Sequence, residues 1–336
     1  MSASWLMTGG IAYLLAAAAV ILYVVMLILR LLKVVRSGTA SDKFANVMFP
    51  GSKTSAPIGG GLNTWRHRYP ALFGLGIFAL IALLFVLPLL LAWSSGEVRT
   101  PYLAIGGRLP WSDASGWLHG LYYVLNEGEL TDWTVRRPLH LMYLSSLTLF
   151  SGLDLYALLL LRTLMLAAAC ALLVRELHLS FGAAAALAAL AMLSGFAATF
   201  SPTTMSEASG LTFGAAALAL LWRGVSREQL GCYALGAALM ALALSVRTGP
   251  VFVLGGILAW PLLWPGAALG QRLRWIMAAG AAIAAGAVLA WVWTYFLYSG
   301  DNMPGANFAF TLYGLAHGGL SWTAFYEQYD LEGMSQ

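Results

Sequence analysis

The sequence predicts an all-α, polytopic membrane protein with about eight transmembrane helices. Of its 336 residues, 60% are hydrophobic and only 10% are charged, and the mean hydropathy is +0.78. Soluble domains carry roughly a quarter charged residues, so too few charges remain to solvate a globule of this size. Two cysteines argue against a disulfide-rich secreted scaffold, and the apolar excess argues against a disordered chain.

Each expected span is an apolar run close to the length of about 20 residues that a bilayer requires. The third run contains Arg162 and the fifth contains Glu207. The first run precedes its basic residues, which is the reverse of a cleavable signal peptide, so we interpret it as a span. The expected spans are residues 11–29, 70–93, 154–174, 179–200, 203–222, 229–246, 250–264 and 275–298.

The distribution of Lys and Arg predicts the orientation. The segment after the first run is rich in both residues and should be cytoplasmic, which places the N-terminus outside. Alternation of the spans then places the remaining basic turns inside as well: Arg175, Arg223, Arg227, Arg272 and Arg274. The chain therefore divides into residues 1–69, an N-terminal span with a flexible cytoplasmic loop; residues 70–298, a transmembrane core with an external loop at 94–153; and residues 299–336, an external C-terminal tail.

Two segments of the external loop are expected to form helices that do not span the membrane. Residues 138–152 are apolar but short, and counting them as a span would move the later basic turns outside. We therefore expect a juxtamembrane or re-entrant helix there. The stretch around residues 112–127 predicts an amphipathic helix with Ser112 or Asp113 at its N-cap. Its expected apolar side consists of Trp117, Leu118, Leu121, Tyr122 and Leu125.

The candidate functional residues are polar side chains on the expected external face, together with one aromatic ring. Most have a structural alternative: Asp113 as a helix cap, the 136–137 pair as lipid-headgroup contacts, Arg247 as a snorkelling side chain and Glu207 as a charge at a helix N-terminus. Arg162 lies near mid-helix and needs a partner inside the bundle, for which we expect a structural ion pair. The candidates are Asp113, Glu207, Arg136, Arg137, His140, Arg247 and Trp117.

The order of these features resembles the membrane glycosyltransferases of the GT-C superfamily, which use polyprenyl-phosphate sugars. Asp113 matches the acidic motif in the first large external loop of that family, and Arg137 with Pro138 matches a basic residue and proline that open the next helix. Glu207 matches an acidic residue on the external rim of a middle span. The stretch GANFAFTLYGLAHGGLSW is similar to a segment of bacterial members. The resemblance covers about residues 70–330, but Asp113 is followed by Ala114, whereas many relatives carry two adjacent acidic residues.

The resemblance implies an enzyme of the bacterial inner membrane with its active face on the periplasmic side. A sugar would move from a polyprenyl-phosphate donor to a glycan, lipid or protein acceptor, with Asp113 as the base and Glu207 as a second catalytic carboxylate. Arg137 and Arg247 would bind the donor phosphate, supported by Arg136, His140 and Trp117. A divalent cation, Mg²⁺ or Mn²⁺, held by Asp113 and Glu207, is left open.

Two other classes of function stay open. The charged Arg162 and Glu207 within spans would suit a lipid or solute transporter or flippase, although no inverted repeat is evident. A non-catalytic subunit of a membrane complex would need a membrane protein partner. In every case we expect membrane lipids as partners. We expect no nucleic-acid partner, because the basic residues at the expected cytoplasmic turns account for the positive net charge.

Overall fold

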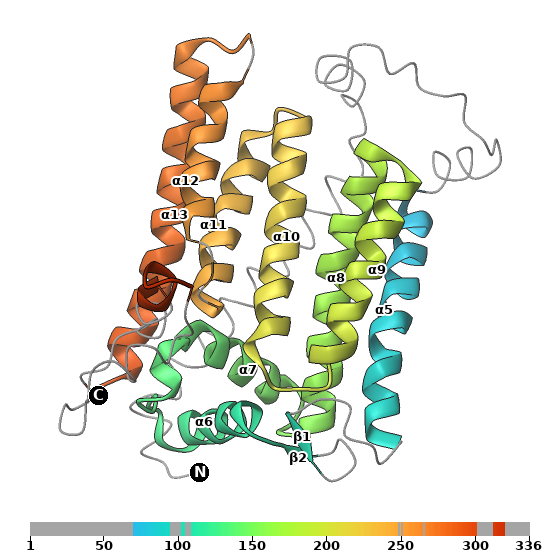
Figure 1. The fold of residues 1–336 in the computed structure, drawn as a ribbon, viewed down its shortest axis with the longest axis vertical. Helices are drawn as coiled ribbons and strands as arrows, with labels where there is room; N and C mark the ends of the chain where they lie inside the picture. Colours follow the sequence, from blue (N-terminus) through green and yellow to red (C-terminus); the bar gives the residue numbers. More distant parts are fainter. Residues whose placement is uncertain are drawn as a thin grey trace.

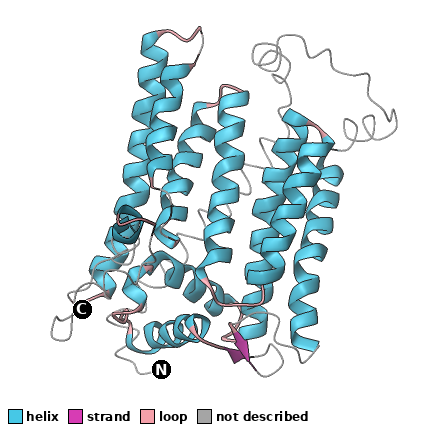
Figure 2. Cartoon of the chain, viewed as in Figure 1, coloured by secondary structure: helices cyan, strands magenta, loops and turns pink. Residues whose placement is uncertain are grey.

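The computed structural model describes residues 70–94, 102–104, 109–247, 249, 251–264, 266–300 and 312–319. These parts form an upright bundle of helices that rests on shorter helices at one end (Figures 1 and 2). The predicted first span at 11–29 and the linker that follows it lie outside the described residues, as does most of the predicted tail at 299–336. The predicted helical membrane protein is thus confirmed for the core, whereas the count of eight spans is not.

Among the described residues, five helices are long and apolar enough to cross a membrane. They are α5 (Pro70–Ser94), α8 (Leu155–Phe181), α9 (Ala183–Phe200), α10 (Ser206–Ser226) and α13 (Leu269–Leu297). Two further expected spans are shorter: α11 (Leu230–Val246) has 17 residues, and α12 (Phe252–Ala259) continues into the 3₁₀ turn η3 (Trp260–Leu263). At 1.5 Å per residue, α11 extends about 25 Å, which is less than the roughly 30 Å of a bilayer core.

The remaining elements lie at one end of the bundle, which we call the site end (Figure 1). They are the paired strands β1 (Leu103–Ala104) and β2 (Leu109–Pro110), the helix α6 (Asp113–Glu127), the 3₁₀ turn η2 (Thr134–Arg136) and the helix α7 (Pro138–Phe150). With 13 residues, α7 is too short to span, and 11 of these residues are buried. It therefore packs at the ends of the long helices, in agreement with a juxtamembrane or re-entrant helix.

Small residues allow α10 and α11 to pack closely. A Cβ atom on Gly236 of α11 would lie 2.7 Å from the backbone nitrogen of Leu221, and one on Gly224 of α10 would lie 2.6 Å from that of Tyr233. Alanines fill the same interface, among them Ala217 and Ala237. Close backbone contact of this kind is typical of helix pairs within membranes, where van der Waals packing drives association.

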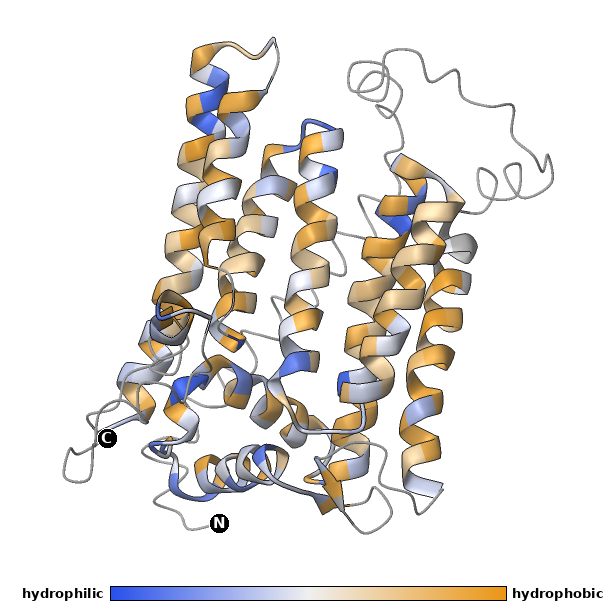
Figure 3. Ribbon diagram, in the orientation of Figure 1, coloured by the Kyte–Doolittle hydropathy of each residue, from blue (hydrophilic) through white to orange (hydrophobic). Residues whose placement is uncertain are grey.

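The surface agrees with a membrane setting. Hydrophobic side chains cover the long helices, and hydrophilic residues gather toward their ends (Figure 3). The exposed side chains of α5 include Leu83 and Leu87, and those of α13 include Met277 and Trp291. These faces are suited to lipid contact, and the apolar helices indicate a multi-pass membrane protein.

The predicted cytoplasmic turns lie at the same end of the bundle, opposite the site end, where α8, α10 and α12 are each followed by a turn (Figure 1). There the buried carboxylate of Glu176 forms ion pairs with Arg175, Arg223 and Arg227 at N–O distances of 3.3, 3.2 and 2.9 Å. Basic residues therefore mark a common end of the bundle, as the alternation of spans requires.

Candidate functional site

The N-terminus of α10 gathers charge at the site end. Its first two residues are Ser206 and Glu207, both buried. Arg247, which follows the end of α11, places Nη1 2.7 Å from Oε1 of Glu207 and 3.4 Å from the hydroxyl oxygen of Ser206. Gly210, one turn along α10, gives Arg247 the room to approach, because a Cβ there would lie 3.1 Å from the Cβ of Arg247.

Arg137 reaches the same hydroxyl from the other side. It lies between η2 and α7 with φ −145° and ψ 65°, and Pro138 then occupies the first position of α7, where its missing N–H costs no helical hydrogen bond. Its Nη1 donates to Ser206 Oγ. Its Cζ lies 5.5 Å from the ring centre of Trp117, a cation–π distance.

Charges of both signs surround Arg137, which is itself partly buried. Burial and the charge of Arg247 lower the pKa of the Arg137 guanidinium, whereas Glu207 and Asp113 act in the opposite direction. An arginine keeps its charge at neutral pH despite such a shift. Both guanidiniums contact Ser206, and only Arg247 is paired with Glu207. Among the described residues no carboxylate is paired with the Arg137 guanidinium, so the two arginines form a basic site suited to an anion.

His140 was predicted to contact substrate, yet its side chain is completely buried. Its Nε2 lies 3.0 Å from the carbonyl oxygen of Thr204, and its Nδ1 lies 3.1 Å from the hydroxyl of Ser209. A carbonyl only accepts, so Nε2 carries the proton and Nδ1 accepts from Ser209. Burial, together with Arg162 and Arg137, holds the pKa of His140 well below 6.5, so the ring is neutral. We interpret His140 as support for the site rather than a ligand contact.

Trp117 connects α6 to this support. Its ring meets the His140 ring edge-on at 4.8 Å and contacts Trp133 at 4.3 Å. The buried face of α6 consists of Ala114, Trp117, Gly120, Leu121 and Val124. The amphipathic helix is thus confirmed, but its inner face is rotated from the expected one, because Tyr122 is exposed and glycine and alanine let α6 approach η2 closely.

Asp113 is the first residue of α6 and is exposed. It makes no hydrogen bond or ion pair with the described residues, although its charge acts on Arg137. Of the two predicted N-cap residues, Ser112 holds that position, with φ 54°, and Asp113 does not; the side chain of Ser112 forms no capping bond. The Asp113 carboxylate is therefore uncommitted beside a basic site.

Arg162 has partners inside the bundle, as expected, but they are not carboxylates. Its guanidinium donates to the carbonyl oxygens of Phe200, Ser201, Thr203 and Met205, and its side chain is fully buried. The expected ion pair is thereby replaced by four backbone bonds. Phe200 and Ser201 end α9, where a cation is favoured by the helix dipole, and Thr203 and Met205 belong to the segment that leads into α10.

The predicted metal option finds little support in the donor set. Among the described residues, no group of three or more His, Cys, Asp or Glu side chains is arranged to hold a metal ion. Glu207 is already committed to Arg247, and Asp113 is the other acidic candidate. Arg136 lies on η2, partly buried, and its charge also lowers the pKa of Arg137.

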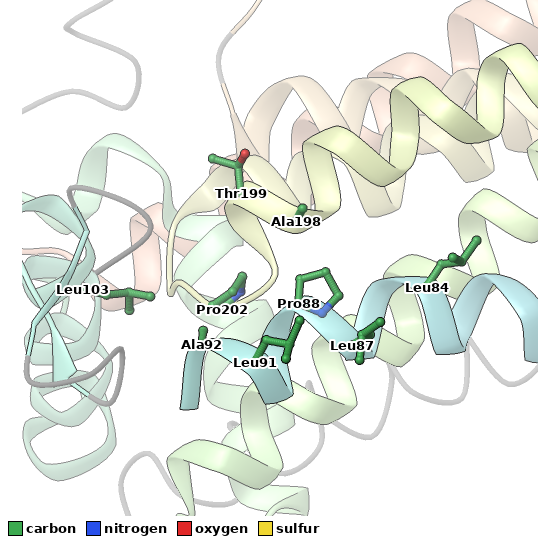
Figure 4. A pocket seen from close by; sticks show the side chains of 9 residues that line it. All are labelled: Leu84, Leu87, Pro88, Leu91, Ala92, Leu103, Ala198, Thr199 and Pro202. Atoms are coloured by element: carbon green, nitrogen blue, oxygen red, sulfur yellow. The ribbon is translucent and has the colours of Figure 1, made fainter. Parts of the chain in front are cut away.

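An apolar cavity of about 310 Å³ lies between α5 and the end of α9 (Figure 4). Leu84, Leu87 and Leu91 of α5 line one side, and Ala198, Thr199 and Pro202 line the other. Pro202 belongs to the segment held by Arg162 and precedes Ser206 by four residues, so the cavity and the basic site are connected through this short stretch of chain.

Sequence reasoning missed the polar residues that join the candidates. Ser206 bridges the two arginines, Ser209 fixes His140, and Thr204 donates to the carbonyl oxygen of Ala114 in α6. The available signal was the polar stretch SPTTMSEAS at residues 201–209, an unusual interruption between two apolar helices.

No protein-family model matches this chain, and neither the search of curated proteins nor that of solved structures gave a match.

Proposed function

We propose that this chain is a membrane glycosyltransferase of the GT-C type, which transfers a sugar from a polyprenyl-phosphate donor to an acceptor at the external membrane surface. The observation that carries the proposal is the convergence of Arg137 and Arg247 on Ser206 at the start of α10, at one end of the bundle. Asp113, which is exposed and uncommitted, lies in the same charge environment.

The two arginines suit a phosphate. Guanidinium groups bind phosphate oxygens with two parallel hydrogen bonds, and a helix N-terminus adds unpaired N–H groups and the positive end of the dipole. Because Glu207 is paired with Arg247, the trio of Arg137, Arg247 and Glu207 keeps a net positive charge. Negative charge that develops on a departing phosphate would be stabilised there.

Asp113 would serve as the general base. In an inverting transfer, the acceptor hydroxyl oxygen forms the new bond to the anomeric carbon while the bond from that carbon to the phosphate oxygen breaks. The hydroxyl proton moves to Asp113, and the bonding electrons leave with the polyprenyl phosphate. Glu207 would act by holding Arg247 in place, since its carboxylate is already paired.

The apolar cavity supports a lipid donor. Its lining consists mainly of leucine, proline and alanine side chains, with Thr199 as the polar member, which suits a prenyl chain of varying length. Because such a tail cannot leave the bilayer, the reacting phosphate would remain at the membrane surface.

The experiment compares Asp113→Asn with wild-type protein, purified and supplied with polyprenyl-phosphate sugars and candidate acceptors. We expect transfer to fall by about 100-fold or more, the contribution of a general base. Asp154→Asn is the matched control: Asp154 caps α8 through a 2.7 Å bond from the amide of Ala157, and asparagine caps equally well.

Wild-type activity retained by Asp113→Asn would remove Asp113 as the base. Failure of the wild-type protein to transfer any polyprenyl-linked sugar would refute the enzyme itself, and movement of that lipid across proteoliposomes without transfer would favour the flippase alternative. Transfer that survives a chelator would argue against a required cation.

A further inference from the structure

Residues 201–205, which we call the junction segment, connect α9 to α10 and touch three other helices. Arg162 of α8 donates to the carbonyl oxygens of Ser201, Thr203 and Met205. His140 of α7 donates to that of Thr204. The junction segment is thereby held by buried cationic and neutral donors from two helices below and beside it.

Thr204 adds a bond to a third helix. Its side chain is fully buried, and its hydroxyl donates to the carbonyl oxygen of Ala114 in the first turn of α6. The same residue therefore bonds α7 through its backbone oxygen and α6 through its hydroxyl. Ala114 directly follows Asp113, and Thr204 precedes Ser206 and Glu207 by two and three residues.

This hydroxyl supplies a directional restraint at a place where the other contacts are apolar. The inner face of α6 packs through Trp117, Leu121 and Val124, and apolar burial depends little on orientation. A hydrogen bond, in contrast, weakens steeply when its angle or length changes. The start of α6 is also held in a rarely populated backbone conformation, with Ser112 at φ 54°, which persists only when surrounding contacts enforce it.

We infer that Thr204 is a positioning residue: its hydroxyl sets the N-terminus of α6, and with it Asp113, at the correct separation from Glu207, Arg137 and Arg247. This inference rests on the proposed function, in which Asp113 takes the acceptor proton and the arginines bind phosphate. Loss of the hydroxyl frees α6 to shift while the phosphate contacts stay in place. A misplacement of about 1 Å can lower a rate by 10²-fold.

The test uses Thr204→Val, which keeps the shape and removes the donor, and Thr204→Ser, which keeps the donor. We expect kcat to fall by about 10-fold to 100-fold in the valine variant, with KM for the donor within about twofold of wild type, and to recover in the serine variant. Thr148→Val is the matched control, because buried Thr148 donates only within α7, to the carbonyl oxygen of Leu144. Thr204→Ala replaces the valine variant if the latter does not fold.

Hydrogen exchange of the α6 amides supplies a readout that does not need activity. We expect faster exchange in Thr204→Val than in wild type, Thr204→Ser or Thr148→Val. Unchanged exchange of the α6 amides would overturn the restraint of α6 by the Thr204 hydroxyl. A wild-type kcat despite faster exchange would overturn the positioning role. A wild-type protein that transfers no sugar would refute the proposed function. The exchange comparison would still decide whether the Thr204 hydroxyl restrains α6.

Discussion

Replacing Arg162 by methionine tests how the site end is held together. The guanidinium is fully buried and donates to four backbone carbonyl oxygens, those of Phe200, Ser201, Thr203 and Met205. Methionine fills much of the same volume but donates nothing. Since the carbonyl groups remain in place, the substitution leaves buried acceptors without their donor rather than removing both partners.

The expected loss of stability follows from that count. The carbonyl oxygen of Phe200 also accepts from the amide and the hydroxyl of Thr203, so three carbonyls lose their donor. A buried polar group without its partner costs about 1–3 kcal/mol, so the lower limit for three carbonyls is about 3 kcal/mol. At roughly 2 °C per kcal/mol, the low end for chains of 150–250 residues, the melting temperature should fall by about 6 °C. Lysine at position 162, with three donors on a compact head, should lose about half as much.

The assay is thermal unfolding of the purified protein in detergent. Arg274→Met is the control, because Arg274 is an exposed arginine in the first turns of α13. The reasoning fails if Arg162→Met melts within about 2 °C of Arg274→Met, since the four carbonyl bonds would then contribute little to stability.

Three further outcomes are expected. The pKa of His140 is held well below 6.5 in the folded protein, so the unfolded chain binds the proton first as the pH falls below that value. The stability of the wild-type protein should therefore fall by up to about 1.4 kcal/mol per pH unit below pH 6.5. Melting curves recorded at successive pH values should show that His140→Gln removes this part of the loss. Glu207→Gln breaks the 2.7 Å ion pair with Arg247 and should lower the transfer rate by about tenfold in the sugar-transfer assay, so an unchanged rate would deny that Glu207 holds Arg247. Gly236→Ala places a Cβ 2.7 Å from the α10 backbone and should destabilise by about 1–3 kcal/mol in thermal unfolding, whereas Gly231→Ala, with nothing within 4 Å, should not.

Prediction from the sequence worked best where the signal lies along the chain. Hydropathy located the five long helices, and a surplus of arginine identified the turns that lie opposite the site end. The short apolar run at 138–152 could be separated from the spans because treating it as one would have scattered the basic turns across both sides. Helix periodicity located α6 as well, although it did not orient its inner face.

Prediction was weakest where a side chain meets residues distant in sequence. Arg162 lies 38 or more residues from each carbonyl that it binds, and no pattern along α8 indicates those acceptors. His140 and Ser209 are 69 residues apart, so a histidine near a basic pair was interpreted as a ligand contact. Burial and hydrogen bonding between such residues depend on how the helices pack.

Composition and charge order by themselves determined that this chain is a helical membrane protein and where most of its helices run, because the bilayer restricts length and hydropathy locally. Only the tertiary structure decided that Glu207 pairs with Arg247, that Asp113 is exposed and that Thr204 joins α6 to the junction segment. Those relations depend on how α6, α7, α10 and α11 pack, since Arg247 follows the end of α11. A linear pattern does not encode the contact distances that this packing sets.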